Sequence, residues 1–346
     1  MISEGLLQSP DCLILGISAG GVLERILRSA LGPWLQLLLF LASSFIIIWR
    51  LECMTERGME GTVLGTLIMP YCSGVGNLIF VLVLGRTNGP GKEVLTNCLV
   101  NNVTNLTLLI GIPAIFWGMA VIPAGKVKKT AAKTYRINRL SLLLTTVAVF
   151  FFTGILWALA RDGVLNFGDG LVLIGVFLFW QCFHVCDVLK NNVVKNRGFQ
   201  WVLLIDLALL AVGTWGLYIS VEWLVEWLSK IETGFISRDH MGWLSGWLMV
   251  LPNALLALYY GWRNRPDIVY SSQMGDGHIC IPLCIGIFCL FSNIRVPAFF
   301  DTGIAIILGA AAIHFLFIAA IGRLPRWVGW ILLVTYTGFV YLGLVE

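Results

Sequence analysis

The sequence predicts an all-α polytopic membrane protein of about ten transmembrane helices, arranged as two inverted repeats of five helices. Three observations lead to this prediction. Hydrophobic residues make up 58% of the 346 residues and charged residues only 12%, whereas soluble domains carry about 25% charged residues. Apolar runs recur along the whole chain, and a bilayer needs about 20 such residues per helix. Finally, Lys and Arg gather in alternate loops, as in multi-pass membrane proteins.

The apolar runs define the elements in order. Residues 1–32 hold a short apolar stretch without a signal-peptide cleavage site, so we expect a surface helix or a re-entrant segment there. The predicted spans are 33–50, 59–84, 94–120, 139–160, 168–188, 201–226, 241–262, 277–294, 300–321 and 326–344. The polar stretch 189–200 divides a first repeat, 33–190, from a second, 191–346. Because five is an odd number, the second repeat must enter the membrane from the opposite side, a plan common among secondary transporters.

The basic residues predict the orientation in the membrane. If the loop 121–139 is cytoplasmic, then 15 of the 23 Lys and Arg residues lie on the cytoplasmic side and both termini lie outside. The 15 residues are Arg50, Arg57, Lys126, Lys128, Lys129, Lys133, Arg136, Arg139, Lys190, Lys195, Arg197, Arg263, Arg265, Arg323 and Arg326. We therefore expect an integral protein of a bacterial-type cell membrane. Membrane topology accounts for the net charge of +4, and no nucleic-acid partner is expected.

Proline and glycine interrupt two predicted spans at corresponding places in the two halves. Pro70, Gly74 and Gly76 lie in the second span, and Pro252 lies in the seventh. A proline inside a helix removes one backbone donor and clashes with the carbonyl four residues earlier. Oxygens freed in this way can bind a cation where they line a cavity. Either proline alone fits an ordinary kink, but helix breaks at matching positions indicate a binding site near the membrane midplane.

Asparagine side chains are unusually frequent in the same region. Asn97, Asn101 and Asn105 recur every four residues and so share one helix face, and Asn77 lies in the preceding span. An amide in hydrocarbon is costly unless it is paired, so these residues should face the protein interior. Two interpretations stay open, because such a row can line a site or can hold helices together by hydrogen bonds.

Together these segments resemble the calcium/cation antiporter superfamily, the sodium/calcium exchangers and their relatives. Each repeat of that family has a G-T-S-x-P-E helix, and a segment like D-I-A-x-G-N-x-x-G-S-N-I-x-N follows the proline by about fifteen residues. Asp267-Ile268-Val269 follows Pro252 at that interval, and Gly275 falls on a family glycine. In the first half, Asn97, Asn102 and Asn105 fall on the three family asparagines. The resemblance covers about 55–115 and 235–290.

The resemblance implies an ion-binding site, and this chain departs from the family at its centre. The positions of the two family glutamates hold Asn77 and Asn253, and Asp276 is the only acid near the implied core. The implied ligands are Asn77, Asn253, Ser73, Asn97, Asn102, Ser272 and Asp276. Calcium normally takes six to eight oxygens, several of them from carboxylates, so the loss of both glutamates should weaken calcium binding. Asp276 could compensate, although we favour its interpretation as a charge at the N-terminus of a helix.

These residues predict a secondary transporter of the sodium/calcium exchanger type, which moves cations by alternating access at a midplane site. Its expected partners are the lipid bilayer and monovalent or divalent cations. Na⁺ or Ca²⁺ would bind as transported ions, and no cofactor or resident metal is expected. The alternatives are a relative that no longer moves calcium and a membrane scaffold or partner subunit. An enzyme is not expected, because the sequence has no nucleophile–base pair, H-E-x-x-H helix or phosphate loop.

Overall fold

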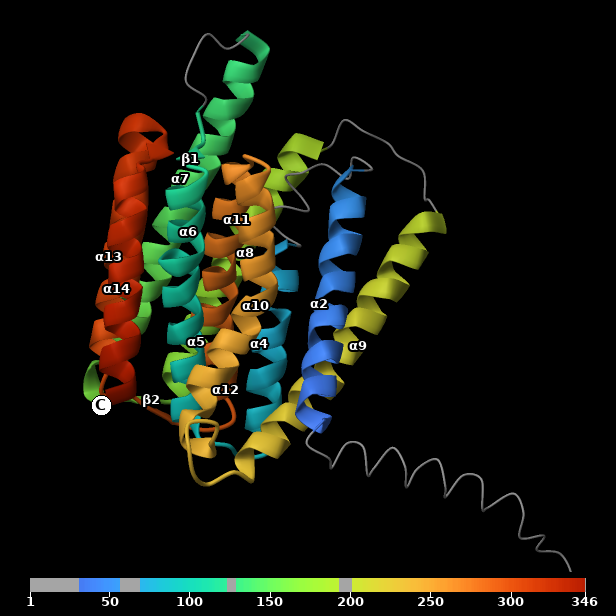
Figure 1. Ribbon diagram of the computed structural model, residues 1–346, viewed down its shortest axis with the longest axis vertical. Coiled ribbons are helices and arrows are strands. Elements are labelled where there is room, and N and C mark those ends of the chain that lie inside the picture. The colour runs from blue at the N-terminus through green and yellow to red at the C-terminus, as the bar shows by residue number, and fades with distance from the viewer. Residues whose placement is uncertain (1–30, 57–68, 123–128, 193–200, 346) are drawn as a thin grey trace, which may run out of the picture.

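The computed structural model describes residues 31–56, 69–122, 129–192 and 201–345, and they form the predicted helical bundle (Figure 1). Ten helical segments cross the bundle in this part of the chain. They are α2 (Gly32–Glu56), α4 (Met69–Arg86), α5 (Gly91–Leu106) with α6 (Leu108–Phe116), α7 (Lys129–Leu159), α8 (Phe167–Asn192), α9 (Trp201–Ser229), α10 (Met241–Trp262), α11 (Pro266–Ile279) with η4 (Cys280–Cys284) and α12 (Ile285–Cys289), α13 (Phe300–Ile321) and α14 (Arg326–Val345). Seven helices of the described chain are long and apolar enough to span a membrane, and Gly74–Arg86 and Phe167–Cys182 are shorter apolar helices. The predicted ten-helix fold is confirmed.

The eighth span differs from its prediction. It begins at Pro266 and ends at Cys289, whereas the sequence pattern placed it at 277–294. The first turns carry Ser272, Asp276 and His278, which lower the local hydropathy. All three are buried against other helices. Because protein rather than lipid surrounds these turns, they need not be apolar.

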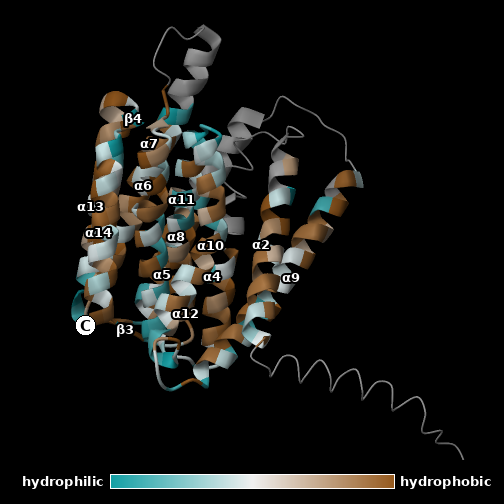
Figure 2. Cartoon of the chain, viewed as in Figure 1, coloured by the Kyte–Doolittle hydropathy of each residue, from teal (hydrophilic) through white to brown (hydrophobic). Residues whose placement is uncertain are grey.

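The helices form a central group flanked by two outer pairs. In Figure 1, α2 and α9 lie side by side at one edge, α13 and α14 lie at the other, and α4, α5, α10 and α11 lie between them. Figure 2 shows apolar colour along the outer helices. α5 and α11 have far more polar sequences and are almost entirely buried. The polar part of the protein is therefore its centre.

Four two-residue strands join the helix ends and obey a two-fold pattern. Strand β1 (Met119–Ala120) pairs with β4 (Arg323–Leu324), and β2 (Val164–Leu165) pairs with β3 (Ile294–Arg295), both antiparallel. In each half, the loop after the third span thus pairs with the loop after the fourth span of the other half. The hydrogen bonds from Val121 N to Gly322 O and from Val296 N to Gly163 O are equivalent in the same way, and both measure 3.0 Å.

Helix packing repeats this pattern. Helix α4 packs on α11 and α10 packs on α5, while α6 packs on α14 and α12 packs on α8. At the last two crossings the backbones nearly touch, at Gly111 with Gly329 and at Gly170 with Gly286. A Cβ at Gly329 would lie 2.7 Å from Gly111 O, and a Cβ at Gly170 would lie 2.8 Å from Gly286 O. Equivalent contacts between helices that run in opposite directions confirm the two inverted repeats.

The ends of the bundle fit the predicted charge asymmetry. In Figure 1, one end of the bundle, here called the β1 end, holds strand β1, the end of α10 and the start of α11. The C-terminal end of α14 lies at the opposite end of the bundle. Arg263, Arg265, Arg323 and Arg326 belong to the β1 end. The orientation of the protein in the membrane stays a prediction, as does the boundary between the repeats near 189–200. Residues 1–30 and 193–200 lie outside the described part of the chain.

Candidate functional site

Helices α4 and α10 cross at the centre of the bundle through a close contact at Gly76. A Cβ at Gly76 would lie 2.7 Å from Met249 Sδ of α10, and a Cβ at Gly74 would lie 2.8 Å from Ile279 Cβ of α11. Both helices are continuous here: α4 runs through Gly74 and Gly76, and α10 runs through Pro252. Gly74, Gly76 and Pro252 thus lie within continuous helices, and their role in forming a binding site stays a prediction. The glycines bring helices together, and α10 continues through Pro252 although the ring leaves one backbone carbonyl without its donor.

The side chains of Pro70 and Ser73 lie outside the described residues, as does Thr66, whose carbonyl Pro70 was expected to free. Their roles stay predictions. The corresponding region of α10 is fully described. There, Gln273 Nε2 of α11 donates a hydrogen bond of 3.2 Å to the backbone oxygen of Asn253, which directly follows the proline. The side chain of Gln273 in α11 thus binds the backbone of α10 next to Pro252.

Asn77 and Asn253 occupy the most unusual environment in the bundle. Both side chains are completely buried. None of their four amide nitrogen and oxygen atoms has a hydrogen-bond partner in the described structure. Leaving a buried polar group unsatisfied costs about 1–3 kcal/mol. Asn77 directly follows Gly76 in α4, and Asn253 lies one turn beyond Met249 in α10, so both residues are close in sequence to the contact of these two helices.

The asparagine row of α5 faces the second repeat. Asn97 Nδ2 donates to Ser245 Oγ of α10 at 3.0 Å, while Asn97 Oδ1 has no partner among the described residues. Asn105 Nδ2 lies 2.7 Å from Asn101 Oδ1 and 2.8 Å from Asp276 Oδ2 of α11. Part of the row therefore does hold helices together. Two oxygens of the same row, Asn97 Oδ1 and Asn105 Oδ1, have no donor among the described residues.

Asp276 is fully buried in the third turn of α11, which begins at Pro266. The interpretation of Asp276 as a charge at a helix N-terminus is therefore wrong. It arose because the predicted span began at 277, eleven residues too late. The carboxylate instead faces α5 and accepts the hydrogen bond from Asn105. Asp276 thus places a carboxyl group within the polar centre.

Asn102 and Ser272 also lie at the contact of α5 with α11. Asn102 Nδ2 donates to Cys98 O at 2.7 Å, and a Cβ at Gly277 would lie 2.5 Å from Asn102 Oδ1. Ser272 is buried, and its hydroxyl has no partner in the described chain. The strand pairs and the glycine contacts show which residues of the two repeats are equivalent: position 111 corresponds to 286, and position 119 corresponds to 294. The residues of each pair are 175 positions apart. By the same offset, Asn97 corresponds to Ser272 and Asn101 corresponds to Asp276.

Of the seven predicted ligands, six therefore gather on α4, α5, α10 and α11 and are buried. Sequence reasoning left Asn101, Asn105, Gln273 and Ser245 out of the ligand set, although all four are buried polar residues at this site. For Asn101, Asn105 and Ser245, polarity inside a predicted span was the signal that could have found them. Gln273 lay between two predicted spans, so no such signal marked it. In the described residues no three His, Cys, Asp or Glu side chains could hold a metal by themselves, so any cation here must use amide and hydroxyl oxygens.

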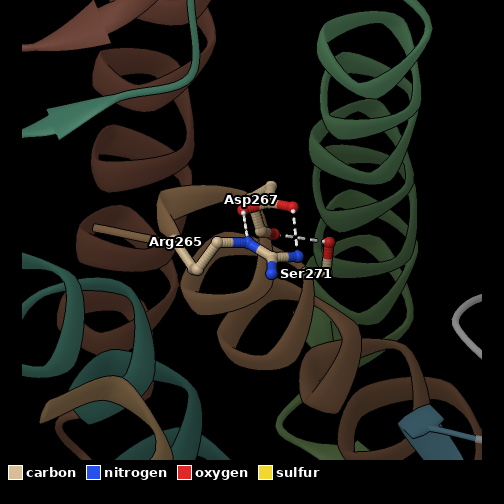
Figure 3. A network of polar contacts seen from close by, with 3 residues as sticks. All are labelled: Arg265, Asp267 and Ser271. Carbon is tan, nitrogen blue, oxygen red and sulfur yellow. Dashed lines mark hydrogen bonds and ion pairs between the residues drawn. The ribbon is translucent and has the colours of Figure 1, made fainter. Parts of the chain in front are cut away.

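Other acidic residues lie away from the centre. Asp267, at the start of α11, lies 3.3 Å from both Nε and Nη2 of Arg265, and Ser271 Oγ donates to its backbone oxygen (Figure 3). Asp206, near the start of α9, is buried and pairs with Arg50 of α2 at 3.0 Å.

The fold and site together define a multi-pass membrane protein with two inverted five-helix repeats and a polar site between them. The family model for sodium/calcium exchanger proteins matches residues 30–185 and 205–345. The chain therefore belongs to the sodium/calcium exchanger family, within the calcium/cation antiporter superfamily, whose members are transporters rather than enzymes.

Solved structures of the sodium-calcium exchanger NCX_Mj have the same fold. The structure soaked with 2.5 mM Na⁺ and 10 mM Sr²⁺ matches with a TM-score of 0.63 at 20% identity, covering 90% of this chain and 97% of that one. The structure soaked with 10 mM Na⁺ and 10 mM Sr²⁺ matches with a TM-score of 0.61 at 18% identity over the same shares. No curated protein sequence matches the chain.

Proposed function

We propose that this protein is a secondary cation transporter, with its binding site among α4, α5, α10 and α11. The observation that carries the proposal is the pair Asn77 and Asn253, which are fully buried and have no hydrogen-bond partners in the described chain. A bound cation would satisfy their oxygens. Because the pair lies between inverted repeats, the two halves can rock about it and expose it to each side in turn.

A cavity supports an access path from the end where α14 terminates. It has a volume of about 590 Å³ and lies between the pair α2 and α9 and the face of α10. Ser245 and Met249 line its inner part. Ser245 accepts the hydrogen bond from Asn97, and Met249 contacts Gly76. A movement of α2 and α9 relative to α10 would therefore open or close a route that ends at the site.

A scaffold or partner subunit is the main alternative, because asparagines can simply join helices. Asn97 and Asn105 do make bonds between helices, and these would suit a scaffold. Asn77 and Asn253 make none, and a scaffold gains nothing by burying them unsatisfied. A transporter gains a preformed ligand pair, so the two central asparagines favour transport over packing.

Cation flux into liposomes that contain the purified protein tests this proposal. We expect accumulation of ²²Na⁺ or ⁴⁵Ca²⁺ along an imposed gradient, and loss of that flux in Asn77→Ala and Asn253→Ala. Thr337→Ala is the matched control, because Thr337 is exposed on α14 and donates only to its own helix at Leu333 O. Equal flux in all four proteins would exclude the site, and no flux of either ion in the unmodified protein would favour the scaffold.

A further inference from the structure

We propose that a phospholipid of the surrounding bilayer inserts one of its acyl chains into the cavity between α10 and the pair α2 and α9. This inference goes beyond the proposed function, because it assigns a ligand to that cavity. It follows from the chemistry of the cavity walls, from the hydrogen bonds of Ser245 and from the residues at the cavity mouth.

The walls of the cavity consist almost entirely of hydrocarbon side chains. Its volume of about 590 Å³ lies within the range of about 300–1,000 Å³ that is usual for ligand pockets. None of the described residues that line it carries a charge. The apolar wall residues include Leu37 of α2, Leu224 and Val225 of α9, and Leu244, Leu248 and Met249 of α10. A hydrocarbon therefore fits this space better than an ion does.

Ser245 has the only hydroxyl group among the described lining residues, and its hydrogen bonds are made within the protein. Ser245 Oγ donates to Gly242 O at 3.2 Å and accepts from Asn97 Nδ2 at 3.0 Å. A buried water needs about two to four polar partners, and apolar cavities that lack them stay dry and take up apolar molecules. The lining thus favours an apolar occupant over water.

The mouth of the cavity is continuous with the lipid-facing surface of the bundle. Two lining residues lie at this surface: Trp34, in the first turn of α2, is 66% exposed, and Ile236, before the start of α10, is 52% exposed. Leu35 and Leu38, beside Trp34 on α2, are also exposed. Tryptophan is enriched where membrane helices meet the lipid headgroups. Phospholipid is therefore the apolar molecule present at this mouth.

The packing of the outer helices leaves the space open for a ligand. Helix α2 packs far more extensively on α9 than either helix packs on α10. A Cβ at Gly213 of α9 would lie 2.7 Å from Ile47 Cγ1 of α2, so these two helices are in close contact. Since protein interiors are otherwise close-packed, an acyl chain in the gap would supply the contacts that α10 does not make with this pair.

The cavity is deep enough to bring the end of a chain close to the polar centre. Its α10 wall extends from Met241 to Met249, a length of about 12 Å at 1.5 Å per residue. The end of an inserted chain would lie beside Ser245 and Met249, where the proposed access route also ends. The chain would therefore have to leave before that route could open. This consequence rests on the proposed function, whereas the binding of the chain does not.

Photolabelling of the full chain in proteoliposomes tests the inference. The probe is phosphatidylcholine with a diazirine near the end of one acyl chain, and the adducts are located by peptide mass spectrometry. We expect adducts on Ser245 and Met249, which are buried, as well as on exposed residues such as Leu316 of α13. Leu224→Trp and Leu244→Trp fill the cavity from opposite walls. Each should reduce labelling of Ser245 and Met249 at least about tenfold, a factor equivalent to about 1.4 kcal/mol.

Leu316→Trp is the matched control, because Leu316 is exposed on α13 at the other edge of the bundle. It should leave the labelling of Ser245 and Met249 unchanged. Adducts confined to exposed residues of the unmodified protein would overturn the inference. Equal labelling of Ser245 and Met249 in the unmodified protein and in both filled variants would overturn it as well. Neither result bears on cation transport, which the flux experiment tests separately.

Discussion

The Asn105 amide nitrogen lies 2.8 Å from the Asp276 carboxylate, and this hydrogen bond joins the two repeats at their most buried point. The same nitrogen lies 2.7 Å from Asn101 Oδ1. Asn105 therefore bridges two positions that the inverted symmetry makes equivalent. This arrangement places a carboxyl group at one of the two equivalent positions and an amide at the other.

The first prediction concerns this bridge. Asn105→Leu removes the donor and leaves the Asp276 carboxylate less well satisfied in a buried site. We expect a loss of about 1–3 kcal/mol in the free energy of unfolding, measured by thermal or denaturant unfolding in detergent. Thr337→Ala is the control, since Thr337 is exposed on α14 and donates only to Leu333 O. A loss in Asn105→Leu no larger than in the control would argue against the bridge.

The second prediction concerns the buried ion pair between α2 and α9. Arg50→Met leaves the Asp206 carboxylate buried without its partner, which should cost about 3–5 kcal/mol. Arg50→Met combined with Asp206→Leu removes both charges and should recover most of that loss. Stability measurements on the two variants decide the matter. If the single and the double variant lose the same amount, the pair at 3.0 Å contributes no specific electrostatic stabilisation.

The third prediction tests the close crossing of α6 and α14. Gly329→Ala would place a Cβ 2.7 Å from Gly111 O and 2.8 Å from Ile115 Cγ1. Because backbone cannot easily move aside, we expect a loss of about 1–3 kcal/mol in unfolding free energy. Gly309→Ala on α13 meets no atom within 4 Å and should be neutral or slightly stabilising, since alanine favours helix over glycine. Equal effects of the two substitutions would contradict the packing.

The fold was largely predictable from the sequence, because the bilayer forces helices of known length and the odd number of spans forces inversion. Asn77 and Asn253 could be predicted as interior residues, since unsatisfied amides avoid lipid. The start of α11 at Pro266 was not predictable from hydropathy, because Ser272 and Asp276 are polar and yet are shielded by α5 and α4.

Contacts between distant segments are not visible in the local sequence. Nothing in the local sequence of Asp206 indicates that Arg50, 156 residues away, lies 3.0 Å from it. In the same way, Gly74 and Gly76 look like helix breakers in isolation. Their contacts with Ile279 and Met249 explain why the helix continues through them.

The fourth prediction concerns orientation in the membrane. Single cysteines introduced into a cysteine-free background should show that the loop 121–139 is cytoplasmic and that both ends of the chain face the outside. Lys126→Cys should react only with membrane-permeant reagents in intact cells, and Glu346→Cys should react with impermeant ones. If impermeant reagents reacted at position 126 and not at position 346, the predicted orientation in the membrane would be reversed.

The fifth prediction addresses the two central asparagines, which the family resemblance places at the positions of the two family glutamates. Asn77→Glu combined with Asn253→Glu would place two carboxylates at the crossing of α4 and α10. Like charges buried together destabilise the empty protein, and a divalent cation relieves their repulsion.

Calcium titration of the unfolding temperature is the most direct measurement of the central claim, that a cation binds between Asn77 and Asn253. We predict that the Asn77→Glu, Asn253→Glu protein gains a calcium-dependent rise in unfolding temperature that the unmodified protein lacks. Choline chloride at equal ionic strength should not reproduce it. A double variant that folds correctly and shows no calcium-dependent rise would contradict the claim, because two carboxylates at the proposed site would then fail to bind the ion that such a site favours.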